Sequence, residues 1–192
     1  MSHFFAYISR MKLIQRWGLM RNTQTENIQE HSLQVAMVAH MLAVIRNRKF
    51  NGDVDPERIA LLALYHDAGE VITGDLPTPI KNFNTEIAGA YKKIENLAAE
   101  KIFKMLPEEL RPDYESIFFH KEDDAENWKI VKAADKICAY LKCLDELQAG
   151  NNAFLKAERS VMAGLMKMNM PEVTYFVETF SPSFSLTLDE LN

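Results

Sequence analysis

The chain has 192 residues, of which 47% are hydrophobic and 26% are charged, and it contains only seven Gly and seven Pro. This composition excludes a disordered or collagen-like chain, and the length suffices for a sizeable core, so we expect one domain that comprises residues 1–192. The formal net charge of −5 argues against a protein that coats a nucleic-acid backbone, because such proteins carry a basic excess or a basic stripe.

Nothing in the sequence predicts export or membrane insertion. No apolar run reaches the roughly 18 residues that a membrane-spanning helix needs. The first residues lack a basic segment followed by a long apolar stretch and a cleavage site. Cys138 and Cys143 lie five residues apart in a helical pattern, which is typical of two buried thiols in a reducing compartment. We therefore expect a soluble, cytoplasmic protein.

Two amphipathic helices are predicted within the first 50 residues, because apolar residues recur there three or four positions apart. The apolar face of the first helix consists of Phe4, Tyr7, Ile8, Met11 and Ile14. The second helix follows capping residues in segment 25–30, and its apolar face consists of Leu33, Met37, Met41, Val44 and Ile45. We expect both faces to point into the core.

A third helix is predicted to start at Asp55-Pro56-Glu57, since Asp caps a helix, Pro suits its first position and an acid is favourable in its first turn. This helix is apolar nearly all round, which predicts a place in the middle of the core. Segment 74–79 then interrupts the helical pattern, because Pro77 and Pro79 favour extended or turn backbone.

The second half of the chain is also helical in its spacing. The apolar positions of four further helices are Ile87, Tyr91, Ile94, Ala98, Ile102 and Met105; Val131, Ala134, Cys138, Leu141 and Leu144; Phe154, Val161 and Leu165; and Val173, Phe176, Val177 and Phe180. No segment shows the alternation that is typical of a strand. We predict an all-α domain of about six to eight helices.

Four polar side chains fall on or beside these apolar faces and need a partner there. His31 opens the second helix, His66 and Asp67 end the third, and Asp135 shares the stripe of Val131 and Cys138. A buried carboxylate without a partner costs several kcal/mol, roughly, or becomes neutral. Two imidazoles and two carboxylates suit a borderline divalent metal such as Mn, Co, Fe, Ni or Zn.

Spacing alone leaves roles without a metal open for these residues. A His-Asp pair arises readily by chance, a core histidine often bonds to a carbonyl group, and Asp135 has Lys132 and Lys136 as neighbours in sequence. Glu70 lies three residues after Asp67 and is either a solvated helix-end residue or a general acid or base beside a metal-bound water.

The order His31, His66-Asp67, Asp135 resembles the pattern of the HD-domain phosphohydrolases. Four further segments make the chain similar to the bacterial 5'-deoxynucleotidases of the YfbR type within that superfamily, and the resemblance spans nearly the whole sequence. These segments are Arg16-Trp17 with Thr25-Glu26-Asn27-Ile28-Gln29-Glu30-His31-Ser32, Gly74-Asp75-Leu76-Pro77-Thr78-Pro79, and Ala139-Tyr140-Leu141-Lys142-Cys143-Leu144. Gly69 departs from the pattern, since a serine is expected there.

The resemblance implies an HD-domain fold and hydrolysis of deoxyribonucleoside 5'-monophosphates to deoxynucleoside and phosphate. It implies one divalent transition metal, with Co2+ or Mn2+ favoured, and a homodimer that binds neither nucleic acid nor membrane. The implied metal ligands are His31, His66, Asp67 and Asp135. Glu70 is the implied proton donor to the leaving 5' oxygen.

The resemblance also assigns the substrate contacts. Arg16 is expected at the phosphate, Asp75 at the 3'-hydroxyl, and Thr78 elsewhere on the nucleotide. Trp17 is expected to fill the space of a ribose 2'-hydroxyl and so to select deoxyribose. Without the resemblance, Arg16 is interpreted as part of a surface ion pair, Trp17 as a core aromatic residue, and Pro77 and Pro79 as a rigid turn.

Competing functions are a nucleoside triphosphate or alarmone phosphohydrolase on the same fold and a non-catalytic nucleotide or metal sensor. The first needs a larger basic phosphate site than Arg16 and Lys81 provide, and the second has no use for Glu70. His120 and Glu122 offer a second metal site only weakly, and His40 is expected in the core. The aromatic segment 175–184 either caps the core or forms the dimer contact.

Overall fold

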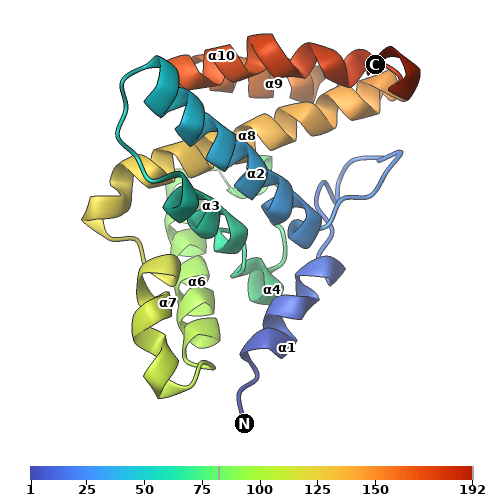
Figure 1. Ribbon diagram of the computed structural model, residues 1–192. Coiled ribbons are helices and arrows are strands. Elements are labelled where there is room, and N and C mark those ends of the chain that lie inside the picture. The colour runs from blue at the N-terminus through green and yellow to red at the C-terminus, as the bar shows by residue number, and fades with distance from the viewer. Residues whose placement is uncertain (82, 192) are drawn as a thin grey trace.

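The computed structural model describes residues 1–81 and 83–191, and its regular structure is helical, so the all-α prediction is confirmed (Figure 1). The only strand-like pairing in this part of the chain is an isolated antiparallel bridge between Gln15 and Asn27. The α-helices are α1 (Phe4–Ile8), α2 (Ile28–Lys49), α3 (Pro56–Tyr65), α4 (Glu70–Thr73), α5 (Thr78–Lys81), α6 (Thr85–Phe103), α7 (Arg111–Phe118), α8 (Ala125–Gln148), α9 (Leu155–Met166) and α10 (Pro171–Phe180).

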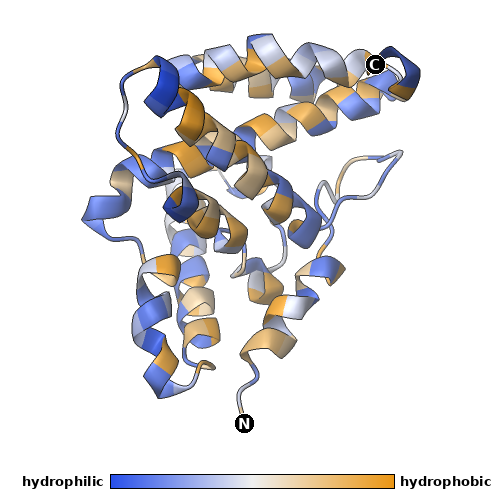
Figure 2. Cartoon of the chain, viewed as in Figure 1, coloured by the Kyte–Doolittle hydropathy of each residue, from blue (hydrophilic) through white to orange (hydrophobic). Residues whose placement is uncertain are grey.

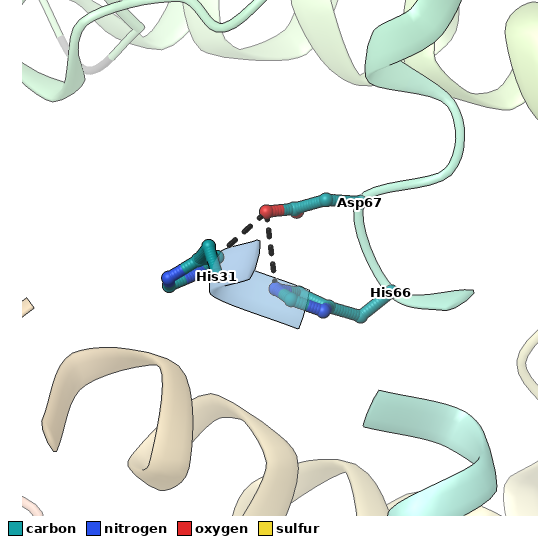
Figure 3. Close-up of side chains that lie close together, drawn as sticks. All are labelled: His31, His66 and Asp67. Atoms are coloured by element: carbon teal, nitrogen blue, oxygen red, sulfur yellow. Dashed lines mark ion pairs between the residues drawn. The ribbon is translucent and has the colours of Figure 1, made fainter. Parts of the chain in front are cut away.

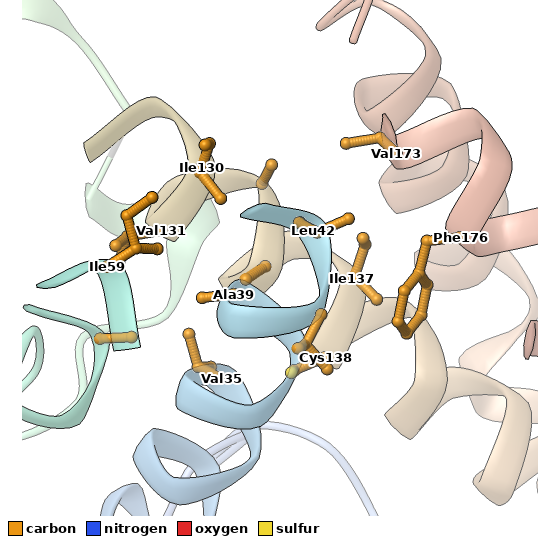
Figure 4. Close-up of a cluster of buried hydrophobic side chains, with 14 of the residues drawn as sticks. Val35, Ala39, Leu42, Ile59, Ile130, Val131, Ile137, Cys138, Val173 and Phe176 are labelled. Carbon is orange, nitrogen blue, oxygen red and sulfur yellow. The ribbon is translucent and has the colours of Figure 1, made fainter. Parts of the chain in front are cut away.

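Helices α2 and α8 cross at the centre of the molecule and form the frame on which the other helices pack (Figure 1). Helix α3 packs against both of them, and α9 and α10 cover the side that faces away from α6 and α7. The core between them is formed by side chains such as Val35 and Leu42 of α2 and Ile137 and Cys138 of α8 (Figure 4). The predicted stripe of α8 therefore does point inward.

The apolar face predicted for α2 is wrong in part. Leu33, Met37 and Met41 point outward, with 55%, 60% and 38% of their surface exposed. The buried face is instead formed by smaller residues such as Val35, together with Ala39 and Leu42. Because α2 carries apolar residues on both sides, helical spacing alone did not identify the inner one (Figure 2).

Contrary to the prediction, helix α3 is not surrounded by the core on all sides. Ile59 and Leu62 are fully buried, but Leu61 and Leu64 are 37% and 39% exposed. Its predicted start is confirmed, because the Asp55 carboxylate accepts a hydrogen bond from the Arg58 backbone N–H at 3.0 Å. The first predicted helix, residues 4–14, divides into α1 and a 3-10 helix (Ser9–Leu13).

The aromatic residues near the C-terminal end pack on the core. Phe176 is buried there, and Tyr175, Phe180 and Phe184 lie against the same cluster. This segment therefore caps the core, which was one of the two predicted roles. None of the described helices is both long enough and apolar enough to cross a membrane.

Candidate active site

Three of the four predicted metal ligands meet where α2 begins and α3 ends. The Asn27 side chain caps α2 by accepting hydrogen bonds from two backbone N–H groups, and one turn later His31 is fully buried. His66 ends α3, and Asp67 lies in the turn that follows. The Asp67 Oδ2 atom lies 3.1 Å from His66 Nε2 and 3.8 Å from His31 Nε2 (Figure 3).

The donor atoms of this cluster fit a divalent metal. One ligand atom from each of the three residues lies within 4.8 Å of the others, and no second such group occurs among residues 1–81 and 83–191. His66 Nδ1 is 2.7 Å from the Ala63 carbonyl oxygen, to which it donates, so the proton of a neutral ring is on Nδ1. His66 Nε2 is then a buried lone pair with no hydrogen-bond donor against it in the described structure.

Asp135 joins the cluster from α8. Its Oδ1 atom lies 3.0 Å from His31 Nε2 and 3.9 Å from Arg16 Nη2, so its ionic partners come from the site and not from Lys132 or Lys136. The Asp135 side chain is 43% exposed, which places it at the rim of the cluster, whereas His31 lies at its base. All four predicted ligands are thus neighbours, and their role as ligands stays a prediction.

The charges of the cluster determine which groups hold protons without a metal. Burial alone lowers the pKa of His66, but the Asp67 and Asp135 carboxylates outweigh it and raise that pKa to about 9. Burial raises the pKa of Asp67, yet His66, His31 and Arg16 bring it well below its usual value. A metal bound at His66 Nε2, as predicted, would have to displace this proton.

Glu70 follows a break in the helix that the sequence did not reveal. Helix α3 stops at Tyr65, four residues form turns, and α4 begins at Glu70. Glu70 Oε2 is buried without a hydrogen-bond partner in the described part of the chain. Burial and the nearby Asp67 and Asp75 carboxylates raise the pKa of Glu70 to about 9, so this acid is protonated at neutral pH.

Gly69 lies directly before α4 with ordinary helical backbone (φ −61°, ψ −27°). A Cβ added there would meet Ala98 Cβ at 3.8 Å, which is normal contact. We expect Gly69→Ala to raise the free energy of unfolding by about 0.5–1 kcal/mol, because alanine restricts the unfolded chain more than glycine does. Urea unfolding of the two proteins measures this. A destabilised variant would mean that the turn needs backbone freedom which its dihedral angles do not show.

Arg16 and Trp17 lie beside the cluster on the segment before α2. Arg16 Nη1 lies 3.4 Å from Asp67 Oδ2, and the side chain is only 13% exposed. Both residues donate to Glu26 Oε2, Arg16 from Nε and Trp17 from Nε1, each at 3.1 Å. The sequence does not reveal Glu26 as a site residue, since it only places Glu26 before a helix and in the family-like run 25–32, with no role for its side chain.

The loop that carries Asp75 and Thr78 is attached to α6. Asp75 lies close to Arg16 and to the backbone of Trp17, while burial is the main cause that raises its pKa. Thr78 is exposed at the start of α5, and no described contact links its side chain to the cluster. Lys81 pairs with Glu95 at 2.5 Å and lies 4.8 Å from the Tyr91 ring, so it links α5 to α6.

A buried carboxylate anchors the segment between Trp17 and α2. Glu146 of α8 is 1% exposed and pairs with Lys142 at 2.5 Å. It accepts hydrogen bonds from the backbone N–H and hydroxyl of Thr23 at 2.9 and 2.8 Å, and from Asn151 at 2.7 Å. Burial raises the pKa of Glu146, but these donors bring it down to about 2. The Arg16-Trp17 segment is therefore fixed to α8 as well as to α2.

The remaining histidines lie outside the site. His120 is exposed and stacks on Trp128 with ring centroids 3.8 Å apart, and burial, Lys132 and Lys92 lower its pKa. Neither His120 nor Glu122 belongs to a metal-type group in the part of the chain that is described. His40 is exposed on α2, so its predicted place in the core is wrong.

Comparison with solved structures identifies the fold. An HD-domain phosphohydrolase of Listeria innocua superimposes with a TM-score of 0.82 at 24% identity, covering 95% of this chain and 88% of that one. An HD phosphohydrolase of cyanophage S-2L, bound to dA and one catalytic Zn2+ ion, gives a TM-score of 0.65 at 19% identity over 93% and 96% of the two chains. Both likenesses show the HD-domain fold.

Sequence comparison is more specific. The chain is 59% identical over 191 residues to a 5'-deoxynucleotidase of Vibrio cholerae, covering 100% of this chain and 98% of the relative. It is 58% identical over 192 residues to a 5'-deoxynucleotidase of Yersinia pestis, with the same coverage. The sequence model described as 5'-deoxynucleotidase YfbR-like matches residues 3–184. The chain belongs to the YfbR-like family of 5'-deoxynucleotidases.

Proposed function

We propose that residues 1–192 form one HD phosphohydrolase domain that hydrolyses deoxyribonucleoside 5'-monophosphates to deoxynucleoside and phosphate. The observation that carries this proposal is the cluster of His31, His66 and Asp67 beside an acid, Glu70, whose pKa is raised to about 9. A nucleotide sensor has no use for such an acid. A triphosphate or alarmone hydrolase would need more basic groups beside the cluster than Arg16, and Lys81 is paired with Glu95.

The proposed metal ligands are His31, His66, Asp67 and Asp135, and the proposed ion is Co2+ or Mn2+. A divalent ion held there supplies positive charge that polarises the phosphoryl group and favours ionisation of water. Arg16 binds the phosphate. Its Nη atoms make only long contacts with Asp67 and Asp135, at 3.4 and 3.9 Å, so their N–H groups are available to phosphate oxygens.

Glu70 donates its proton to the 5' oxygen as the bond to phosphorus breaks, so that the product leaves as a neutral alcohol. Its burial and its carboxylate neighbours keep that proton in place until substrate binds. For the sugar, Asp75 accepts a hydrogen bond from the 3'-hydroxyl, Thr78 contacts the nucleotide from the loop, and Trp17 excludes the 2'-hydroxyl.

Phosphate release from nucleotides tests this function. Protein stripped of metal is expected to release phosphate from deoxyadenylate only after Co2+ or Mn2+ is restored, and to act more slowly on adenylate and on deoxyadenosine triphosphate. If none of the divalent metals restores phosphate release, the enzymatic proposal is contradicted. Equal rates for adenylate and deoxyadenylate would contradict the role of Trp17 alone.

We further propose a cytoplasmic homodimer that pairs through α2. Leu33, Met37 and Met41 form an exposed apolar stripe with equal spacing on either side of Met37. A two-fold axis at Met37 would place Leu33 opposite the partner's Met41 and would make the two helices antiparallel. The acidic start of one α2 would then lie beside the basic end of the other. Leu64 of α3 lines the same surface groove as Leu33 and adds to this apolar surface.

Met37→Lys tests this contact, because it places two like charges at the centre of the pair. We expect the variant to sediment as a monomer at a concentration where the wild type is a dimer. The matched control is Leu110→Lys, which changes an exposed leucine far from α2 and should leave the dimer intact. A dimeric Met37→Lys variant would exclude the α2 interface.

A further inference from the structure

The backbone places Glu26 directly beside Arg16. The Arg16 N–H donates to the Glu26 carbonyl oxygen at 2.8 Å, and the Ile28 N–H donates to the Ile14 carbonyl oxygen at 3.0 Å. These bonds flank the bridge between Gln15 and Asn27 and fix the register of the two segments. The side chain of Glu26 therefore has a set position relative to the Arg16-Trp17 pair and to the start of α2.

The Glu26 carboxylate contacts three residues with different proposed tasks. Oε2 accepts hydrogen bonds from Arg16 Nε and Trp17 Nε1, each at 3.1 Å. Oε1 lies 3.6 Å from His31 Nδ1 on the side of the ring that faces away from Asp67 and Asp135. The Glu26 side chain is only 12% exposed, so water screens these contacts little.

Trp17 needs side-chain contacts to hold its backbone and its ring in place. Its backbone lies in the left-handed region with φ 57°, which is unfavourable for a bulky residue unless the surroundings hold it. The indole packs against Phe154 in a tilted arrangement, with ring centroids 5.3 Å apart. The hydrogen bond from Nε1 to Glu26 is the second side-chain contact and restricts rotation of the ring.

The contact between Glu26 and His31 affects the proposed metal site. A metal bound at Nε2 would require the ring proton to be on Nδ1, and Glu26 Oε1, 3.6 Å away, is the carboxylate oxygen on that side of the ring. His31 Nδ1 makes no hydrogen bond in the described structure, although the ring is fully buried, and its ion-pair neighbour is Glu26 Oε1 at 3.6 Å. Glu26 is thus the acceptor on the Nδ1 side of this histidine, opposite Asp135 on the Nε2 side.

We infer that Glu26 is a positioning residue that orients the metal-facing His31, the phosphate-facing Arg16 and the sugar-facing Trp17 through a single carboxylate. Metal affinity and selection of deoxyribose therefore depend on the same side chain. The sugar part of this inference rests on the proposed function, whereas the metal part depends only on the contact between Glu26 and His31.

Glu26→Gln tests both parts, because it keeps the size of the side chain and removes its charge. We expect the affinity of the metal-free protein for Mn2+, measured by calorimetry, to fall about 10–100-fold, as when other outer partners of metal-binding histidines are removed. We expect the ratio of kcat/KM for deoxyadenylate to that for adenylate to fall about tenfold, because the acceptor of the hydrogen bonds from Arg16 and Trp17 loses its charge.

Trp17→Phe is the matched control. It keeps an aromatic ring on Phe154 but removes the Nε1–H donor, so it should lower the deoxy-to-ribo ratio and leave the Mn2+ affinity within about twofold. A residue with a merely structural role would lower the thermal midpoint and change both substrates equally. Glu26→Gln with unchanged Mn2+ affinity and an unchanged ratio would overturn the inference.

Glu26→Asp covers the case in which Glu26→Gln does not fold. It keeps the charge but withdraws the carboxylate from the indole by one methylene, so the deoxy-to-ribo ratio should fall; an unchanged ratio would again overturn the inference. If wild-type protein does not hydrolyse deoxyadenylate at all, the proposed function fails, and the Mn2+ measurement alone still decides the contact with His31.

Discussion

Glu70→Gln is expected to lower kcat about 10²–10⁴-fold while a divalent metal still binds. The amide matches the carboxyl group in shape but has no proton to give to the leaving 5' oxygen. Glu70 is also outside the proposed ligand set, so calorimetry with Mn2+ should give wild-type affinity within a few-fold. Single-turnover release of phosphate from deoxyadenylate measures the chemical step directly.

The pH dependence of kcat gives a second measure of the same role. In the metal-free chain the pKa of Glu70 is raised to about 9, first by burial and then by the Asp67 and Asp75 carboxylates. A bound cation offsets those carboxylates, so the working pKa lies lower. Since the acid must be protonated to act, wild-type activity should fall as the pH rises through that value, and Glu70→Gln should lack this alkaline decline.

Glu109→Gln is the matched control, since this exposed glutamate lies away from the site and its replacement should change neither kcat nor its pH profile. Turnover by Glu70→Gln within about threefold of wild type would show that another group donates the proton.

Asp67→Asn is expected to abolish metal binding at neutral pH. Asp67 Oδ2 lies between the Nε2 atoms of His66 and His31, at 3.1 and 3.8 Å, and the amide cannot replace its charge. Loss of an outer partner already costs about 10–100-fold in affinity, so loss of this ligand should cost more. Calorimetry with Mn2+ and phosphate release from deoxyadenylate both report the effect.

The same substitution should change the proton balance of the site. In the metal-free protein burial lowers the pKa of His66, but Asp67 and Asp135 raise it to about 9. Below that pH the metal must displace the proton, so affinity should rise about tenfold per pH unit from 7 towards 9 and then level off. The proton also stabilises the metal-free fold below about pH 6.5, and this contribution is lost as the pH rises through 9.

In Asp67→Asn the pKa of His66 should fall, which histidine NMR of the metal-free protein can follow. Asp113→Asn, at an exposed position of α7, is the matched control and should leave both the affinity and the His66 titration unchanged. Wild-type Mn2+ affinity in Asp67→Asn would contradict the proposed ligand set.

The helices themselves were predictable because their starts have local causes. Asp55 and Pro56 begin α3 as expected, and the inward stripe of α8 agrees with its apolar spacing. The outward stripe of α2 was not predictable, since Met37 looks like a core residue until its neighbours are known. That distinction depends on which helices pack where, and a single helix does not encode it.

The candidate site shows the same division. The proximity of His31, His66 and Asp67 followed from their apolar surroundings and from the family pattern. The turns between Tyr65 and Glu70 had no signal, because residues 66–69 include no proline and are compatible with a helix. Glu26 was missed because its importance comes from the pairing of two segments ten residues apart, which only the folded chain brings together.

The low pKa of Glu146 has a consequence for the order in which the parts of the site are lost as the pH falls. Because its pKa is lowered to about 2, the stabilisation it provides is fully present above the ordinary glutamate value, declines below it and is gone once the pH has fallen through about 2. His66 takes up its proton at far higher pH. Mild acid should therefore release a metal from the proposed site while the Arg16-Trp17 segment stays docked. We expect inactivation at pH 5 to be reversed by neutralisation with added metal.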